Sequence, residues 1–447
     1  MIQTKPVIID LFCGCGGLAC GFQKAGFQIA AGLDIEEAAI QTASYNLHWR
    51  YGEETTYKCL DITETDAHEF ADRVGDEGCI VIGGPPCQAY SLAGRAKLRS
   101  LGKERENIND KRGYLYQDFL RFAVDLQAKA IVMENVPEST NYGGKNIPEI
   151  VCSQLEEEGY RAIWTLLNAA DYGVPQTRER IFVIAVQKKL GKEIQLPEPT
   201  HRSNYPDNTN AGARIRSMTR FPHFSTPLVP EENLPSWITV RDAISDLPSL
   251  FQDPFQKYSL GRIAQKDPYL SEAQNDFQIL MRTWYGDSMD KVTGNIFRKT
   301  LRDFPIFDQM KQGDNFQQAS KIADQLFQNA AWAQGITEEN NPDEYIRLKK
   351  KIVPPYNREK FLYKWTRLVE SKPSHTLVAH LSVDTYSHIH PWEPRGISVR
   401  EAARLQSFPD GFLFQTSMGD AYKQIGNAVP PCLSLAIAKA VDKTLNG

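Results

Sequence analysis

The sequence contains no apolar run of the ~18 residues that a membrane-spanning helix needs, and no charged N-terminal segment followed by an apolar one. Its eight cysteines in 447 residues are too few for a disulfide-stabilised scaffold. Cys13, Cys15 and Cys20 lie close together, but no second cysteine pair follows them at zinc-ligand spacing. These absences predict a soluble, reduced protein of the cytoplasm, without a metal site and without a membrane partner.

The chain also lacks a net positive charge. Its formal charge is −4, so any surface that attracts nucleic acid must be local. The composition, with 41% hydrophobic and 24% charged residues, is typical of a globular protein. A chain of 447 residues is long enough for two domains, or for one large domain with an insertion.

A glycine-rich turn follows the first apolar segment. Residues 7–12 predict a buried strand, residues 13–17 a turn and residues 18–25 a helix. Glycines let a backbone approach a ligand, and the N–H groups at the start of a helix can bind it. The turn lacks the G-x-G-x-x-G spacing of a dinucleotide site, and no lysine follows it as in a P-loop. Alone, it is weak evidence for any one cofactor.

Acidic residues follow the next two predicted strands. Asp34 ends a strand over 27–33, and Asp61 ends a strand over 55–60. The first carboxylate can accept hydrogen bonds from both hydroxyls of a ribose, and the second can meet an adenine amino group. Each acid can instead cap the helix that follows it. Together with the glycine turn, the two acids indicate an adenosine moiety rather than a phosphate clamp.

A cysteine follows the fourth buried strand, 79–82, after two glycines and two prolines. The prolines stop the strand and restrict the backbone, so they hold Cys87 at the edge where open α/β sheets bind ligands. A free cysteine is more often a small buried apolar residue. Here polar residues follow it, namely Gln88, Ser91 and Arg95. We therefore interpret Cys87 as an activated thiolate.

Charged residues also stand at the ends of later strands. Glu134 follows a strand over 130–133, and Arg178 and Arg180 lead into a strand over 181–186. Alternate residues of a strand share a face, so the two arginines should point the same way. The alternative is an ion-paired surface strand. The charged stretch over 96–112 is either a lid beside the site or a solvated loop.

Strand–helix alternation disappears between about 201 and 395. Arginines gather at its start, where Asp207 is the only acid nearby: Arg202, Arg214, Arg216 and Arg220. Histidines interleave with aromatic residues over 360–390, but without metal-ligand spacing, which favours packing or polar contacts. Recognisable patterns of secondary structure resume after residue 397. They are a capping box at Ser398 and Glu401, a constrained loop over 424–431 and an apolar helix over 433–445. We expect that helix to pack on the first sheet.

These motifs, in their order along the chain, resemble those of the DNA (cytosine-5) methyltransferases. The motifs are Asp10-Leu11-Phe12-x-Gly14-x-Gly16-Gly17, Asp34, Asp61, Pro85-Pro86-Cys87-Gln88, Glu134-Asn135-Val136, Gln176-x-Arg178-x-Arg180 and Gly426-Asn427-x-Val429-Pro430-Pro431. The resemblance implies an α/β fold. A Rossmann-like, S-adenosylmethionine-dependent domain would comprise residues 1–197 and 398–447. A smaller, irregular target-recognition domain, 198–397, would be inserted before the C-terminal helix.

The resemblance also implies a chemistry for the charged residues. Cys87 would add to C6 of a cytosine, which turns C5 into a nucleophile for the methyl group. Glu134 would protonate or hydrogen-bond N3, and Arg180 would bind O2 with Arg178 beside it. Because a stacked cytosine is out of reach, the base would be flipped into the pocket. Gln88, Ser91 and Arg95 would contact the substrate.

The implied methyl donor is S-adenosylmethionine. Its expected binding residues come from strand ends, the glycine turn and the segment before the C-terminal helix: Asp10, Phe12, Gly14, Gly16, Gly17, Asp34, Ile35, Asp61, Ile62, Pro85, Asn427 and Val429. The expected state is a monomer in the bacterial cytoplasm that binds duplex DNA, with a restriction endonuclease acting separately. Two alternatives remain: a transfer-RNA cytosine-5 methyltransferase, and a non-catalytic nucleic-acid-binding relative, which should lack Cys87 or Glu134.

Overall fold

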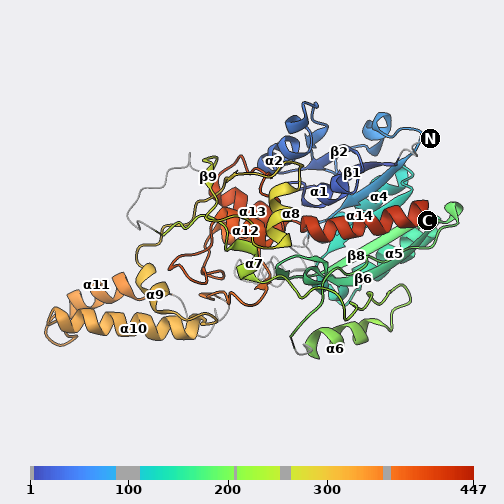
Figure 1. Cartoon of the computed structure of the whole chain (residues 1–447). Helices are drawn as coiled ribbons and strands as arrows, with labels where there is room; N and C mark the ends of the chain where they lie inside the picture. Colours follow the sequence, from blue (N-terminus) through green and yellow to red (C-terminus); the bar gives the residue numbers. More distant parts are fainter. Residues whose placement is uncertain (1–4, 87–110, 206–208, 252–262, 356–363) are drawn as a thin grey trace. The chain divides into compact units, whose positions relative to one another are not determined.

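The computed structural model describes residues 5–86, 111–205, 209–251, 263–355 and 364–447 (Figure 1). The predicted residues Cys87, Gln88, Ser91 and Arg95, and most of the predicted lid, lie outside these ranges. The chain forms two compact units. Unit 1 comprises Met1–Ile238, Gln406–Phe408 and Asn427–Gly447, and unit 2 comprises Thr239–Leu405 and Pro409–Gly426.

A seven-stranded sheet forms the centre of unit 1, in the order β3-β2-β1-β4-β5-β8-β6. Its strands are β1 (Val7–Leu11), β2 (Ile29–Asp34), β3 (Tyr57–Cys59), β4 (Cys79–Gly83), β5 (Ala130–Asn135), β6 (Tyr160–Asn168) and β8 (Glu179–Gln187). Strands β1 to β5 run parallel to one another, and β8 is antiparallel to both β5 and β6. The sheet confirms the predicted α/β class. Its central strands are buried on both faces, which explains their continuous apolar sequences.

Helices pack on this sheet within unit 1 (Figure 1). They are α1 (Gly17–Lys24), α2 (Glu37–Leu47), α4 (Leu115–Asp125), α5 (Ile147–Glu157), α6 (Thr209–Met218) and α14 (Pro431–Asn446). On one face, Phe119 of α4 and Val151 of α5 share a core with Val81, Ile131 and Val183 of the strands. Each predicted helix of this unit is present, with ends that differ by one to a few residues.

The C-terminal helix α14 packs closely on α1 because Gly21 has no side chain. A Cβ atom at Gly21 would lie 2.4 Å from Ser434 Oγ and 2.5 Å from the backbone nitrogen of Leu435. The Ser434 hydroxyl in turn donates a hydrogen bond to the Leu18 carbonyl. Unit 1 is therefore discontinuous in sequence.

Unit 2 has little regular sheet. It contains α7 (Val240–Ile244), α8 (Asp276–Thr283), α9 (Phe304–Gln309), α10 (Phe316–Ala333), α11 (Pro342–Ile352), α12 (Val399–Leu405), α13 (Met418–Asn427) and the short strands β9 (Asp267–Pro268), β10 (Lys291–Val292) and β11 (Ser374–His375). Helices α10 and α11 lie side by side, with the rings of Phe327 and Tyr345 in contact (Figure 1). Stacked aromatic rings, such as Trp365 on Tyr386 with centroids 4.8 Å apart, form one core.

Buried ion pairs hold another part of unit 2 together. The Arg404 guanidinium lies between the carboxylates of Asp246, at 3.0 Å, and Asp410, at 2.5 Å. Arg282 joins the same Asp246 carboxylate at 2.6 Å. Breaking one such pair would leave a buried charge without its counterion, which typically costs about 3–5 kcal/mol. These contacts give an irregular segment a defined structure.

The compact units differ in extent from the predicted functional domains, which remain a prediction. Residues 198–238 belong to unit 1 because Phe221 and Phe224 pack on Trp164 of β6. Helix α12 belongs to unit 2, and its predicted capping box between Ser398 and Glu401 is present. The loop expected over 424–431 begins later than predicted, because α13 continues to Asn427.

Two histidines of unit 2, His388 and His390, are buried in its interior, whereas His375 and His380 are exposed. The rings of His375 and His388 stack with their centroids 4.0 Å apart. Burial lowers the pKa of His388 well below its usual value, so this ring is neutral at physiological pH. In the described ranges no cluster of histidine, cysteine or acidic residues is arranged to hold a metal ion. The same ranges contain no helix that is long and apolar enough to cross a membrane.

We predict that Gly21→Ala destabilises the protein by about 1–3 kcal/mol, because the added methyl group overlaps α14. Urea unfolding measures the change. The control is Gly212→Ala in α6, where the nearest atom to a new Cβ is the flexible tip of Arg216 at 3.2 Å. That substitution should be neutral or stabilising by up to about 1 kcal/mol. Equal effects of the two substitutions would contradict the close contact between α1 and α14.

Candidate active site

The carboxyl ends of β1, β2, β4 and β5 meet at one edge of the sheet. The strand order changes direction at β1, where β2 lies on one side and β4 on the other. Ligands of open α/β sheets bind outside the strand ends at such a point. The residues predicted for the cofactor and for catalysis follow these strands.

The turn after β1 has a strained backbone. Phe12 and Gly14 have φ values of 54° and 53°, and Gly16 has a φ of 85°. A positive φ costs energy at a bulky residue such as Phe12 and persists where the surroundings enforce it, often at functional sites. Apart from its two neighbours in the chain, no described residue has an atom within 4 Å of the position that a Cβ of Gly14 would take. The turn therefore presents open backbone at the sheet edge.

Asp34 closes this turn. Its Oδ2 accepts a hydrogen bond from the Gly14 N–H and its Oδ1 accepts one from the Glu36 N–H, both at 2.9 Å. Burial raises the pKa of Asp34, and these two bonds partly oppose that rise. Each carboxylate oxygen keeps a lone pair for a ligand. The side chain of Ile35 is 66% exposed beside it, so an apolar surface is available for a flat ring.

Asp61 and Ile62 are engaged locally. Asp61 Oδ1 accepts hydrogen bonds from the Thr63 N–H at 2.9 Å and from the Thr63 hydroxyl at 2.8 Å. These bonds form a local turn rather than a helix cap, and the helical segment that follows, η2 (Ala67–Arg73), is capped by Asp66. The Ile62 side chain lies in the core of the sheet, so only its backbone can face a cofactor.

Asp10 lies inside unit 1 rather than on its surface. The Tyr57 hydroxyl donates to Asp10 Oδ2 at 3.5 Å, and Oδ1 has no hydrogen-bond partner among the described residues. Burial and the neighbouring Asp34 raise the pKa of Asp10 well above its ordinary value. A buried carboxyl of this kind is stable in its neutral form. We therefore interpret Asp10 as a buried residue that stabilises the structure next to the glycine turn.

A network of side chains holds the segment before α14 against the glycine turn. Gln176 in β7 (Gln176–Thr177) donates to Gln406 Oε1 at 2.5 Å, and Gln406 donates to the Ala428 carbonyl at 2.6 Å. The buried Arg178 donates to the same carbonyl at 3.2 Å. The sequence motif did not reveal this role of Arg178, and it gave no indication of Gln406 beyond its place in a predicted helix.

This network sets the position of the predicted cofactor residues Asn427 and Val429. Asn427 is exposed and Val429 is buried. A Cβ atom at Gly17 would lie 2.6 Å from the Val429 carbonyl, so only glycine lets the two segments come this close. The strand-end turn and the C-terminal segment therefore meet at one site.

Glu134 and Arg180 form an ion pair at the carboxyl end of β5. Arg180 Nε lies 2.8 Å from Glu134 Oε1, and both side chains are about nine-tenths buried. Burial raises the pKa of Glu134, and the charges of Arg180 and Arg178 oppose that rise. A carboxyl group with a raised pKa can hold and deliver a proton near neutral pH.

The segment that leads to Cys87 lies next to this acid. The lack of a side chain at Gly84 lets this segment approach Glu134, because a Cβ atom at Gly84 would lie 3.0 Å from Glu134 Oε2. The Asn135 amide donates to the carbonyl of Pro85, which is buried, at 3.5 Å. A hydrogen bond thus joins the end of β5 to Pro85, and Cys87 lies two residues after Pro85 in the sequence.

Six of the seven described cysteines, all except Cys20, have a raised thiol pKa and so offer no activated thiolate. Burial raises the pKa of Cys79 to about 12 and that of Cys432 to about 11. Burial likewise raises the pKa of the Cys13, Cys15 and Cys152 thiols. Cys59 is exposed, yet its pKa is also raised. A nucleophilic thiolate needs the opposite shift.

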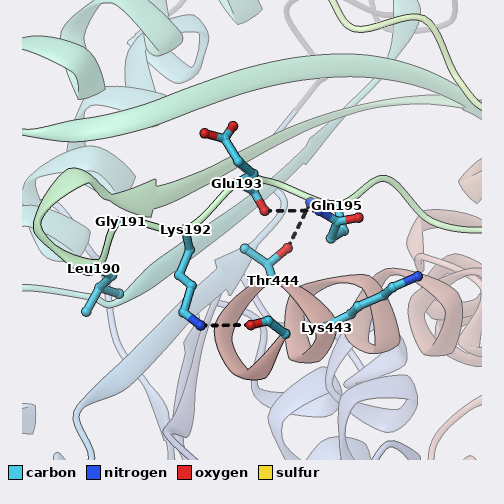
Figure 2. A pocket seen from close by; sticks show the side chains of 8 residues that line it. Leu190, Gly191, Lys192, Glu193, Gln195, Lys443 and Thr444 are labelled. Atoms are coloured by element: carbon cyan, nitrogen blue, oxygen red, sulfur yellow. Dashed lines mark hydrogen bonds between the residues drawn. The ribbon is translucent and has the colours of Figure 1, made fainter.

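A hollow of about 550 Å³ lies elsewhere in unit 1, where the loop after β8 meets the end of α14 (Figure 2). Its lining comprises Leu190, Gly191, Lys192, Glu193, Gln195, Lys443, Thr444 and Gly447. The Gln195 N–H donates to the Thr444 hydroxyl at 2.9 Å, and Lys192 donates to the Gly447 carbonyl at 3.0 Å. None of the predicted site residues lines this hollow, so we assign it no part in the active site.

The family model of the C-5 cytosine-specific DNA methylases matches residues 7–443 of the chain. The chain belongs to this family. The methylase is 55% identical over 451 residues to an Oceanobacillus iheyensis protein named "Putative type II methyltransferase M.OihORF3336P", with 100% of this chain and 97% of that protein covered. It is 30% identical over 461 residues to the type II methyltransferase M.AgeI of Thalassovita gelatinovora, with 97% and 98% covered. The predicted family is confirmed.

A solved structure has the same fold as the methylase. It is entitled a "putative DNA modification methyltransferase" encoded within a prophage of E. coli. The two structures superpose with a TM-score of 0.65 at 22% sequence identity, over 98% of this chain and 99% of that one. At this level of identity the likeness concerns the fold alone.

We predict that Asp34→Ala weakens S-adenosylmethionine binding by about 1.5–3 kcal/mol, the range for a hydrogen bond to a charged group. Isothermal titration calorimetry measures the affinity. The matched control is Asp66→Ala. The Asp66 carboxylate also accepts a hydrogen bond from the backbone N–H two residues later, that of His68, at 2.9 Å, but Asp66 is exposed. The control should bind normally. Unchanged affinity in a folded Asp34→Ala protein would reject the assignment.

Proposed function

We propose that this methylase transfers a methyl group from S-adenosylmethionine to C5 of a cytosine within a specific duplex DNA sequence. The observation that carries the proposal is the Glu134–Arg180 pair at 2.8 Å, beside the proline turn that leads to Cys87. An acid that can hold a proton, an arginine and a thiol at one sheet edge are the groups needed for addition to an electron-poor ring.

The residues at the carboxyl ends of β1 and β2 fit the proposed cofactor. The open backbone at Gly14, the free lone pairs of Asp34 and the exposed Ile35 suit a ribose and an adenine ring. Asn427 and Val429 would lie near the methionine part, where the Gln406 and Arg178 bonds hold their segment. When bound, S-adenosylmethionine supplies a methyl group on a positively charged sulfur.

The proposed reaction begins at Cys87. Its thiolate forms a bond to C6 of the cytosine, and Glu134 gives a proton or a hydrogen bond to N3 as the ring accepts the electron pair. Arg180, held by Glu134, would bind O2. C5 then takes the methyl group, a base removes the C5 proton, and the electron pair of that C–H bond expels the thiolate from C6.

Access to the base requires it to leave the duplex. A stacked cytosine cannot reach a buried acid, so we propose that the base is flipped into the site. Relatives carry the name type II methyltransferase, which supports a role in restriction–modification with a separately acting endonuclease. Bisulfite sequencing of DNA from expressing cells tests both the modified base and its sequence context. Methylation of transfer RNA instead of duplex DNA would overturn the proposed substrate.

The covalent step can be trapped with 5-fluorocytosine at the target position, because fluorine cannot leave as a cation. With S-adenosylmethionine present, the complex should survive denaturing electrophoresis, and the adduct should map to the peptide that contains Cys87. Cys87→Ser should abolish the band, since serine is far less nucleophilic at neutral pH. Glu134→Gln should slow its formation. Cys59→Ser, which removes the exposed described thiol, is the matched control and should leave the band unchanged.

A second prediction concerns sequence recognition. We propose that residues 198–397 read the target, because they lie outside the catalytic motifs and carry arginines, which suit guanine edges. Replacing 201–395 with the corresponding segment of a relative of different specificity should change the methylated sequence to that of the donor. Bisulfite sequencing detects the change. An active chimera that still methylates the original sequence would refute the assignment.

A further inference from the structure

The segment around α6 carries an exposed group of arginines. Arg214, Arg216 and Arg220 are all exposed. Residues 201–225 contain four arginines and one aspartate, a formal charge of 4 − 1 = +3, whereas the whole chain has a charge of −4. In the described part of the chain, neither Arg216 nor Arg220 forms a salt bridge. Positive charge is thus concentrated on this surface, available to an anionic partner.

This segment is fixed to the catalytic sheet. Met218 is buried in the core that also contains α4 and α5, and Ile215 packs against that core. Phe224 contacts Trp164 of the edge strand β6, with ring centroids 4.7 Å apart. The backbone N–H of Trp164 donates a hydrogen bond to the His223 carbonyl at 2.9 Å. The backbone N–H of Ser225 in turn donates to the Trp164 carbonyl at 2.8 Å. The arginines are therefore held by a firmly packed support.

An ion pair places α6 near the catalytic acid. Arg214 pairs with Glu179, the first residue of β8. The next residue, Arg180, binds Glu134. Because neighbouring residues of a strand point to opposite faces, α6 lies on the other face of β8 from Glu134, at the same end of the strand. The exposed arginines are thus beside the strand end at which a flipped cytosine would enter.

We propose that Arg216 and Arg220 bind the phosphate backbone of duplex DNA that flanks the flipped cytosine. The inference rests on the proposed function and adds a contact surface to it. Arginine binds phosphate oxygens through two parallel hydrogen bonds. Contacts to phosphates fix the position of a protein on the duplex without reading its sequence. Their placement on unit 1 would set the distance between the DNA backbone and the Glu134–Arg180 pair.

The test is the salt dependence of DNA binding by the full-length protein. Binding is measured between 50 and 300 mM salt to the duplex identified by bisulfite sequencing and to a scrambled duplex. Each lost phosphate contact lowers the slope of log K against log salt by about 0.9. Arg216→Gln with Arg220→Gln should therefore lower the slope by about 2, equally on both duplexes. The methylated sequence should stay the same.

The matched control is Lys189→Gln. Lys189 is an exposed cation two residues beyond Gln187, the other end of β8, which lies roughly 26 Å along the strand from Glu179 at about 3.3 Å per residue. It should leave both slopes unchanged. Unchanged slopes in the double variant would overturn the proposal, since Arg216 and Arg220 would then be solvated surface charges. A loss confined to the target duplex, or an altered methylated sequence, would overturn it in favour of base reading. If the unaltered protein binds neither duplex, the proposed function itself fails.

Discussion

The carbonyl oxygen of Ala428 accepts hydrogen bonds from Arg178 and from Gln406, and the assembly of the active site depends on these two bonds. The bond from Arg178 joins the residue between β7 and β8 to the segment before α14, and the bond from Gln406 joins the residue after α12 to the same segment. A bond from a buried guanidinium is worth about 1.5–3 kcal/mol, a sizeable part of the stability of a domain. Without them, the Val429 carbonyl would not be held against Gly17, and the residues that we propose to bind the cofactor would not share one site.

Two opposing electrostatic effects meet at Glu134. Burial favours its neutral form, whereas Arg180 at 2.8 Å and the nearby Arg178 favour the carboxylate. The net result is a raised pKa, so burial is the stronger effect. A carboxyl group with a pKa raised in this way can exchange a proton with a bound ring at a small cost in free energy. A fully solvated glutamate, or a strongly ion-paired one, could not do so.

Much of the sheet could be predicted from sequence, because its central strands are apolar runs bounded by glycine, proline or acidic residues. The acids Asp34 and Glu134 were recognisable by their place at strand ends. The contacts of Arg178 and Gln406 could not be predicted, since both bonds depend on residues distant in the chain. Ile62 shows the converse limit, because the side chain of a residue predicted to bind the cofactor lies in the core. Similarly, nothing in residues 201–225 indicated that Phe221 and Phe224 would anchor them to β6.

The closeness of α1 and α14 has a consequence for how the protein is made. Helix α14, which covers α1, is synthesised long after α1 and after the whole of unit 2. Until then, the surface around Gly21 and Leu18 has no partner, while unit 2 already has all of its residues. Domains usually fold as units during synthesis, from the N-terminal end onward. In this chain the unit that begins first is completed last, so translation itself delays the formation of a working active site.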